Sequence, residues 1–280
     1  MAWTLTDDPE RYLAATRRLL SARPAGNTVI LSAVAALQAA GPAVFGDAPP
    51  LFGWWHDGGS ATAAFMHTPP FSVVLTHLPA GASAELAGEL ASRGRQPAGV
   101  IATAATSQAF AADWQARTGV PARVLRRSRL FRLGKLAPPG PAPDGRARVA
   151  GAADRELLIS WVRAFSREIE EEGDVERAVD ERLGHAGLTL WETADGPVSL
   201  AGHTRPAGGQ ARIGPVYTPP GRRGRGFGGA VTAAVSQALL DANAGEVVLF
   251  TDLANPTSNA LYQRLGYQPV SDWLMIRFGC

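Results

Sequence analysis

The sequence contains a single cysteine, a single lysine and no long hydrophobic run. The cysteine, Cys280, is the last residue, which excludes disulfide scaffolds and metal sites built on cysteine. The longest apolar stretch, residues 28–40, is too short to cross a bilayer. Residues 1–10 carry two aspartates and a proline instead of an apolar run, so no signal peptide is predicted. We therefore expect a cytoplasmic protein with no membrane partner.

Neither sign of charge is in large excess. The 27 Lys and Arg residues against 25 Asp and Glu residues leave a net charge of +2, which does not predict a general nucleic-acid binder. The arginine-rich segment 123–135 best fits a strand with one solvated face, so nucleic acid is not an expected partner. Hydrophobic residues make up 46% of the 280 residues, enough for the cores of one large or two small domains.

Residues 136–148 are rich in Pro, Gly and Ala and are predicted to be a linker between domains at 1–135 and 149–280. On each side of this linker, the sequence predicts the same order of elements: two helices, three strands, a helix, a strand, a helix and a strand. In the first half these are 9–20, 28–38, 51–56, 61–67, 71–77, 82–92, 99–103, 107–117 and 122–133. In the second half they are 154–170, 175–183, 188–193, 198–204, 211–218, 230–243, 246–253, 256–265 and 269–278. The repeated order indicates a duplicated α/β fold, with a mixed sheet flanked by helices in each half.

Residues 222–229 lie between a predicted strand and a predicted helix and include three arginines and four glycines. Glycine lets backbone N–H groups approach an anion closely, and the helix start adds free N–H groups and a positive dipole end. The arginines add positive charge. The segment therefore predicts a diphosphate site, and the alternative is an exposed basic loop that only caps a helix.

A dinucleotide site of the Rossmann type is a second alternative. Gly224, Gly226 and Gly229 have the spacing of that fingerprint, and Asp252 follows 23 residues after Gly229. Two features count against it. Residues 219–223 separate the strand from the first glycine, and the 28 residues after Asp252 leave no room for the strands and helices that complete such a sheet.

Two motifs resemble those of the GNAT superfamily of acyl-CoA-dependent N-acetyltransferases. The first is Arg223-x-x-Gly226-x-Gly228 at the strand-to-helix junction. The second follows one strand later and consists of Asn255, Pro256, Ser258, Leu261, Tyr262, Leu265, Gly266 and Tyr267. The motifs cover about residues 210–270, and the element order extends the resemblance to about 150–280.

The resemblance implies tandem acyl-CoA N-acyltransferase-like domains, with acetyl-CoA as co-substrate and no metal. Strand 212–218 would splay from strand 246–253 and bind the pantetheine arm through Val216, Tyr217 and Thr218. The pyrophosphate would lie on Arg223, Gly224, Arg225, Gly226, Phe227, Gly228 and Gly229. Asn255 would hold the pantetheine, and Tyr262 would donate a proton to the departing thiolate. The acceptor would be a primary amine of a small molecule or a protein, attacking the thioester directly.

A thiolate leaving group with a pKa of about 8.5 benefits from a nearby hydroxyl donor, which agrees with the role implied for Tyr262. The alternative for Tyr262 is a tyrosine that only packs in the core. For Asn255 the alternative is helix capping alone. A CoA-binding or sensor protein without catalysis is the corresponding alternative for the whole chain.

The general base is not fixed by the sequence. Strand 212–218 contains no carboxylate, so Asp252 at the end of the next strand is preferred, and capping of the following turn is its alternative role. Glu192, His203 and a chain of water molecules are the other candidates. An acidic run could attract a cationic amine or form a solvated helix end. It comprises Glu168, Glu170, Glu171, Glu172 and Asp174.

The first half lacks this machinery. The segment between its strand 71–77 and its helix 82–92 has one glycine and no arginine, so it predicts no phosphate site. We therefore expect a degenerate, non-catalytic acetyltransferase-like domain that covers one side of the active cleft or forms a homodimer interface.

Overall fold

The computed structural model describes residues 2–170 and 173–279. The chain forms two compact units, and neither is a continuous segment of sequence. Unit 1 consists of Met1–Leu130, Asp252–Ala254 and Ser271–Cys280. Unit 2 consists of Phe131–Thr251 and Asn255–Val270. The C-terminal strand is thus divided, and its residues from Ser271 on belong to the same unit as the first 130 residues.

Unit 1 contains a mixed sheet whose strands follow the order β1-β2-β3-β4-β5-β12. The strands are β1 (Ala2–Thr6), β2 (Leu51–His56), β3 (Ala63–His67), β4 (Val73–Leu75), β5 (Gly99–Thr103) and the end of β12 (Tyr267–Phe278). The helices are α1 (Pro9–Ser21), α2 (Thr28–Ala40), α3 (Ala82–Ser92) and α4 (Ala104–Thr118). Only β4 and β5 pair in parallel, and all the other neighbours given for this sheet are antiparallel.

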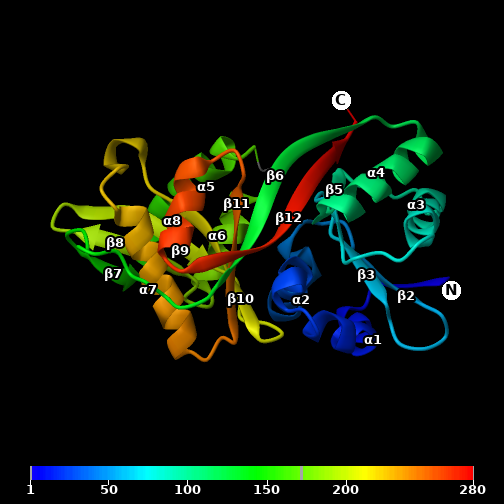
Figure 1. The fold of residues 1–280 in the computed structure, drawn as a ribbon, viewed down its shortest axis with the longest axis horizontal. Helices are drawn as coiled ribbons and strands as arrows, with labels where there is room; N and C mark the ends of the chain where they lie inside the picture. The colour runs from blue at the N-terminus through cyan, green and yellow to red at the C-terminus, as the bar shows by residue number, and fades with distance from the viewer. Residues whose placement is uncertain (1, 171–172, 280) are drawn as a thin grey trace. The chain divides into compact units, whose positions relative to one another are not determined.

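The end of β12 joins this sheet by pairing antiparallel with β5, from Trp273↔Thr103 to Arg277↔Gly99. The first residues of β6 (Ala122–Leu133) follow β12 in the strand order and also belong to unit 1. Ser107 of α4 adds a hydrogen bond from its hydroxyl to the carbonyl oxygen of Leu274 at 3.0 Å. Leu274 and Ile276 are buried in the core that β5 shares with α3 and α4. The end of β12, which lies beside β5 in Figure 1, therefore contributes to the core of unit 1.

Unit 2 repeats this plan, with the strand order β11-β10-β9-β8-β7. Its strands are β7 (Arg146–Val149), β8 (Leu188–Thr193), β9 (Gly196–His203), β10 (Gln210–Tyr217) and β11 (Glu246–Asp252), next to the end of β6 (Ala122–Leu133). Its helices are α5 (Arg155–Glu168), α6 (Val175–Leu183), α7 (Phe227–Asp241) and α8 (Pro256–Arg264). Strands β7 to β10 pair antiparallel, and β10 pairs parallel with β11.

Helices cover both faces of the unit 2 sheet, because residues of its strands alternate between two cores. Leu188 and Leu190 of β8 pack with α5 and α6. Trp191 of the same strand packs on the opposite side with α7 and α8. Figure 1 shows α7 crossing this sheet on the side where α8 also lies.

The predicted mixed α/β fold and the predicted element order are confirmed in both halves. The structure adds one short strand at the start of each repeat, β1 and β7. Strand β7 begins inside the segment 136–148 that the sequence predicts to be a linker. The mostly antiparallel sheet of unit 2 is not the parallel sheet of a Rossmann domain, which removes that alternative.

Candidate active site

Strands β10 and β11 pair over only part of their length. Their parallel register contains four pairs, from Gln210↔Glu246 to Ile213↔Leu249. Strand β10 continues from there to Tyr217, and its other edge pairs with β9 at Val216↔Ala201 and Tyr217↔Leu200. The last residues of β10 thus extend beyond the β11 register, where the resemblance implies an opening for the pantetheine arm.

The glycine-rich turn that follows places backbone N–H groups at the start of α7. Gly224 and Gly226 adopt φ values of +75° and +82°, which favour glycine. Gly226 is the N-cap residue of α7 and provides no side-chain hydrogen bond to the helix. Because the first N–H groups of a helix have no partners within it, this terminus can accept an anion. The turn is exposed, whereas Phe227 is buried and anchors the helix.

Gly228 and Gly229 provide close packing behind this turn. A Cβ atom on Gly228 would lie 3.3 Å from Oγ1 of Thr218. A Cβ atom on Gly229 would lie 3.0 Å from Cδ1 of Leu261. Both glycines therefore let α7 approach its neighbours, while Gly224 and Gly226 shape the turn itself.

The three arginines near the turn have different surroundings. Nε of Arg223 donates to the carbonyl oxygen of Thr218 at 2.8 Å, and its Nη2 lies 2.6 Å from Oε1 of Glu168. Nη1 of Arg222 lies 3.8 Å from a carboxylate oxygen of Asp195. Arg225 is exposed. The turn therefore combines positive charge with donor groups, which fits a diphosphate.

Tyr262 of α8 lies in the core of unit 2 next to α7. Its side chain is buried, and burial raises the pKa of its hydroxyl to about 12. The ring is 6.1 Å from that of Tyr267, whose hydroxyl pairs with Oγ of Ser236 at 2.7 Å. Tyr262 thus packs in the core, as its alternative role requires. Its hydroxyl is protonated at neutral pH and can still donate a proton.

Asn255 and Asp252 both stabilise the turn between β11 and α8. Oδ1 of Asn255 accepts a hydrogen bond from the N–H of Ser258 at 3.0 Å and caps α8. Oδ1 of Asp252 accepts one from the N–H of Ala254 at 2.8 Å. Both residues thus have the capping role given as their alternative. Pantetheine binding by Asn255 and proton transfer by Asp252 would be second roles of these side chains.

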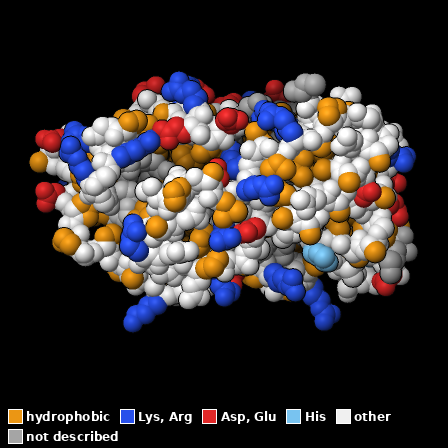
Figure 2. Space-filling view, turned by 45° about the horizontal axis from the view of Figure 1, so that its top comes forward, with side chains coloured by type: hydrophobic (Ala, Val, Ile, Leu, Met, Phe, Trp, Pro, Cys, Tyr) orange, Lys and Arg blue, Asp and Glu red, His pale blue; other side chains and the backbone are white. Residues whose placement is uncertain are grey.

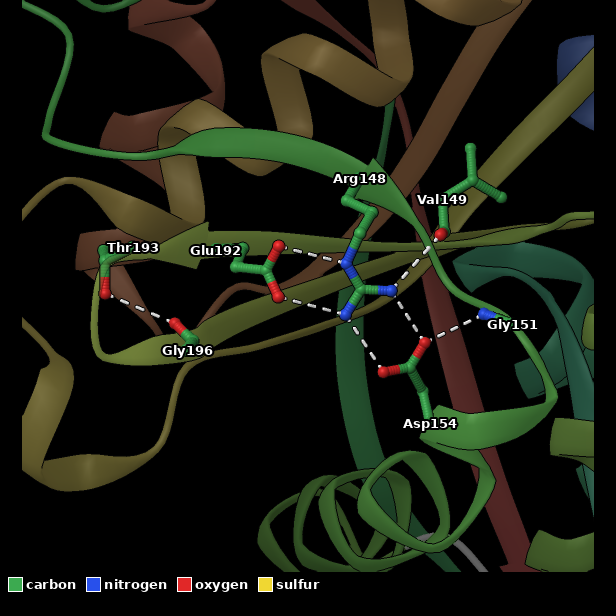
Figure 3. A network of polar contacts seen from close by, with 7 residues as sticks. All are labelled: Arg148, Val149, Gly151, Asp154, Glu192, Thr193 and Gly196. Atoms are coloured by element: carbon green, nitrogen blue, oxygen red, sulfur yellow. Dashed lines mark hydrogen bonds and ion pairs between the residues drawn. The ribbon is translucent and has the colours of Figure 1, made fainter.

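Glu192 belongs to a network of charged side chains that the sequence did not reveal (Figure 3). Arg148 donates to Glu192 at 3.2 Å from both Nε and Nη2. It also donates to the two oxygens of Asp154, at 2.8 and 3.0 Å. Both oxygens of Glu192 are therefore engaged with Arg148. Asp154 precedes α5 without a side-chain hydrogen bond to that helix, and it also accepts a hydrogen bond from the N–H of Gly151.

His203 packs against His185, with ring centroids 5.6 Å apart. Its Nδ1 is 3.0 Å from the carbonyl oxygen of Thr204. Burial lowers the pKa of His203 below its ordinary value, and the nearby His185 lowers it further. The imidazole is therefore neutral at pH 7, so it keeps the protonation state that a general base requires.

The acidic run divides into separate roles. Glu168 pairs with Arg223, and Asp174 caps α6 by accepting from the N–H of Arg177 at 3.0 Å. Glu171 and Glu172 lie outside the described residues. Within the described ranges, no three or more His, Cys, Asp or Glu side chains are grouped to hold a metal ion.

Two further observations concern possible partners. None of the helices built from residues 2–170 and 173–279 has the length and apolar character needed to span a membrane. On the face drawn in Figure 2, Lys and Arg side chains lie in several separate places, with acidic, apolar and uncharged surface between them.

Comparison with known proteins shows which folds this chain resembles and which family matches part of it. Residues 197–274 match the family described as FR47-like protein. A GCN5-related N-acetyltransferase from Sphaerobacter thermophilus has a similar structure, with 17% identity, a TM-score of 0.62, and coverage of 99% of this chain and 97% of that one. A tandem GNAT protein from the clavulanic acid biosynthesis pathway is 14% identical with a TM-score of 0.59, covering 99% and 98%. The predicted resemblance is confirmed: this is a tandem GNAT fold with an FR47-like region in its second half.

Curated relatives match part of the chain, and their names state an activity. A mycothiol acetyltransferase from Paenarthrobacter aurescens (strain TC1) is 33% identical over 175 residues, which are 56% of this chain and 53% of that protein. The chain spans about half the length of the curated relatives that it matches.

Proposed function

We propose that this chain transfers an acetyl group from acetyl-CoA to a primary amine. The observation that carries this proposal is the uncapped start of α7 behind Gly224 and Gly226, in the same unit as the buried hydroxyl of Tyr262. The FR47-like region at 197–274 includes both features. The names of the curated relatives, mycothiol acetyltransferases, support the same chemistry.

In this proposal, the chain's own groups would hold the co-substrate. The N–H groups at the start of α7, together with Arg223 and Arg225, would hold the diphosphate of acetyl-CoA. The backbone of Val216, Tyr217 and Thr218 would hold the pantetheine arm where β10 extends beyond its register with β11. Asn255 would contribute a polar contact in addition to capping α8. Acetyl-CoA supplies the acetyl group as a thioester.

Tyr262 would then donate a proton to the sulfur as the thiolate departs. A phenol with a pKa of about 12 is protonated at neutral pH, and a buried donor acts on developing charge more strongly than one in water. The acceptor must attack as a free amine, so a base must take its proton. Asp252 is the proposed base, and His203 is the alternative that its neutral imidazole supports.

The test is a direct assay with purified protein, acetyl-CoA and a panel of primary amines, read as free CoA thiol and as acetylated product. The panel includes small primary amines, amino acids and peptide N-termini. We expect amine-dependent thiol release with at least one acceptor. If acetyl-CoA raises the melting temperature and no amine is acetylated, the protein is a CoA-binding module instead.

A further inference from the structure

The proline-rich segment between β6 and β7 packs against unit 2. Its residues 137–144, which we call the strap, pass α7 in Figure 1. At one end, the N–H of Ala137 donates to the carbonyl oxygen of Leu265, the C-cap residue of α8, at 3.0 Å. At the other end, Nε1 of Trp191 donates to the carbonyl oxygen of Asp144 at 2.9 Å. Hydrogen bonds to unit 2 therefore hold both ends of the strap.

Between these hydrogen bonds, two prolines of the strap pack on glycines at the start of α7. Three ring atoms of Pro143 lie 3.8, 3.9 and 4.0 Å from the position that a Cβ atom on Gly226 would take. Cγ of Pro139 lies 3.6 Å from the corresponding position on Gly229. Gly226 is the N-cap residue of the helix start that is proposed to hold the diphosphate of CoA. The strap thus packs directly on the proposed diphosphate turn.

The composition of the strap suits this position. Residues 138–143 include four prolines, and their fixed φ leaves the segment few conformations to lose when it packs. The apolar ring beside Gly226 also leaves no room for water between it and the turn. Hydrogen bonds from N–H groups to an anion are stronger where water is excluded. The strap can therefore both order the turn and strengthen its attraction for an anion.

We propose that the strap is part of the acyl-CoA site, and that Pro139 and Pro143 order the start of α7 for the diphosphate of CoA. This inference rests on the proposed acetyltransferase function. Both prolines are positioning residues, since they act through Gly229 and Gly226. The pantetheine arm is proposed to lie on β10 instead, so the strap should matter only for donors that carry the diphosphate.

Two acetyl donors test this role in the 280-residue protein. Acetyl-CoA carries the diphosphate, whereas S-acetylpantetheine has the same thioester and arm without it. Pro143→Ala should weaken CoA binding in calorimetry and raise the KM of acetyl-CoA, each about tenfold, because affinity falls with the fraction of molecules in which the turn is ordered. The KM of the amine, and kcat/KM with S-acetylpantetheine, should change less than about twofold. Pro206→Ala, at an exposed proline between β9 and β10, is the matched control and should change none of these values.

A second variant displaces the strap and keeps its prolines. Gly145, the next residue, has a φ of +110°, and a Cβ atom there would clash with the carbonyl oxygen of Glu192 and lie 2.8 Å from Nε1 of Trp191. Gly145→Ala should therefore move this end of the strap and weaken CoA binding, as Pro143→Ala does. Gly196→Ala is its matched control, since φ is +98° there and a Cβ atom would meet no atom of the described residues within 4 Å.

CoA binding by Pro143→Ala equal to that of the wild type would overturn the proposal. An equal loss of kcat/KM with S-acetylpantetheine would also overturn it, because the effect would then not concern the diphosphate. So would a loss of CoA affinity in Gly196→Ala as large as that in Gly145→Ala. A wild-type protein that neither binds CoA nor acetylates any amine would overturn the proposed function itself.

Discussion

Gly99 of β5 lies directly against the backbone of Ile276 in β12. A Cβ atom on Gly99 would be 2.1 Å from the carbonyl oxygen of Ile276, closer than any real contact. The two residues lie side by side in the sheet, where Ile276 pairs with Val100 and Gly99 pairs with Arg277. The absence of a side chain at position 99 therefore allows the end of β12 to pair with β5 in the sheet of unit 1.

The first prediction follows from this contact. Gly99→Ala should lower the free energy of unfolding by about 1–3 kcal/mol, because the obstructing atom is backbone and both strands must shift. Urea unfolding followed by circular dichroism measures the change. Gly26→Ala is the control, since the nearest atom to its added Cβ is 3.9 Å away. Equal stability of Gly99→Ala and the wild type would contradict the described β5–β12 pairing.

Two buried tyrosines provide a matched pair. Within the ranges 2–170 and 173–279, the hydroxyl of Tyr12 has no hydrogen-bond partner, and its ring stacks on Phe52 at 4.9 Å. The hydroxyl of Tyr267 pairs with Ser236. Tyr12→Phe should therefore stabilise the protein by about 1 kcal/mol, whereas Tyr267→Phe should destabilise it by about as much. Thermal unfolding of both variants measures the difference, and a loss of stability in Tyr12→Phe would contradict the unpaired hydroxyl.

The Arg148 network makes a prediction about pH. Hydrogen bonds from Arg148 lower the pKa of Asp154 below its ordinary value. A carboxyl group whose pKa is lower in the folded state stabilises the fold above its unfolded pKa, and this stability is lost as the pH falls through the folded pKa. Asp154→Asn should thus cost about 1 kcal/mol at pH 7 and much less near pH 3.

Urea unfolding at pH 7, 5 and 3 checks this dependence. Asp195→Asn is the control, because its carboxylate is 77% exposed and lies 3.8 Å from Arg222. A cost for Asp154→Asn that stays constant over this range would show that the ion pair does not stabilise the fold.

The helices and most strands could be predicted from local patterns, whereas their pairing could not. The alternation in β6 and the proline at the start of α8 marked those elements within one or two residues. Strands β1 and β7 have only five and four residues, too few for a clear period. The pairing of β12 with β5 joins residues about 170 apart, and no local pattern contains that information.

The same distinction applies to the candidate site. The spacing of the glycines predicted the turn before α7. Backbone positions with positive φ favour glycine, so the sequence itself marks them. The contacts of Arg223 with Glu168 and of Arg148 with Glu192 join residues 55 and 44 apart, so the sequence offered no sign of them. The roles predicted for Asp252 and Asn255 in binding and proton transfer stay predictions.

The role of Tyr262 is the central claim of the proposed mechanism. Tyr262→Phe removes only the hydroxyl and keeps the buried ring, so acetyl-CoA affinity measured by calorimetry should change less than twofold. With an accepted amine, kcat should fall about 100-fold, because loss of a positioned acid typically costs 10²–10⁴ in rate. The 280-residue wild type and its Tyr262→Phe variant, compared by thiol release and by acetyl-CoA titration, give both values. An unchanged kcat at full acetyl-CoA affinity would contradict the account and remove Tyr262 from the reaction.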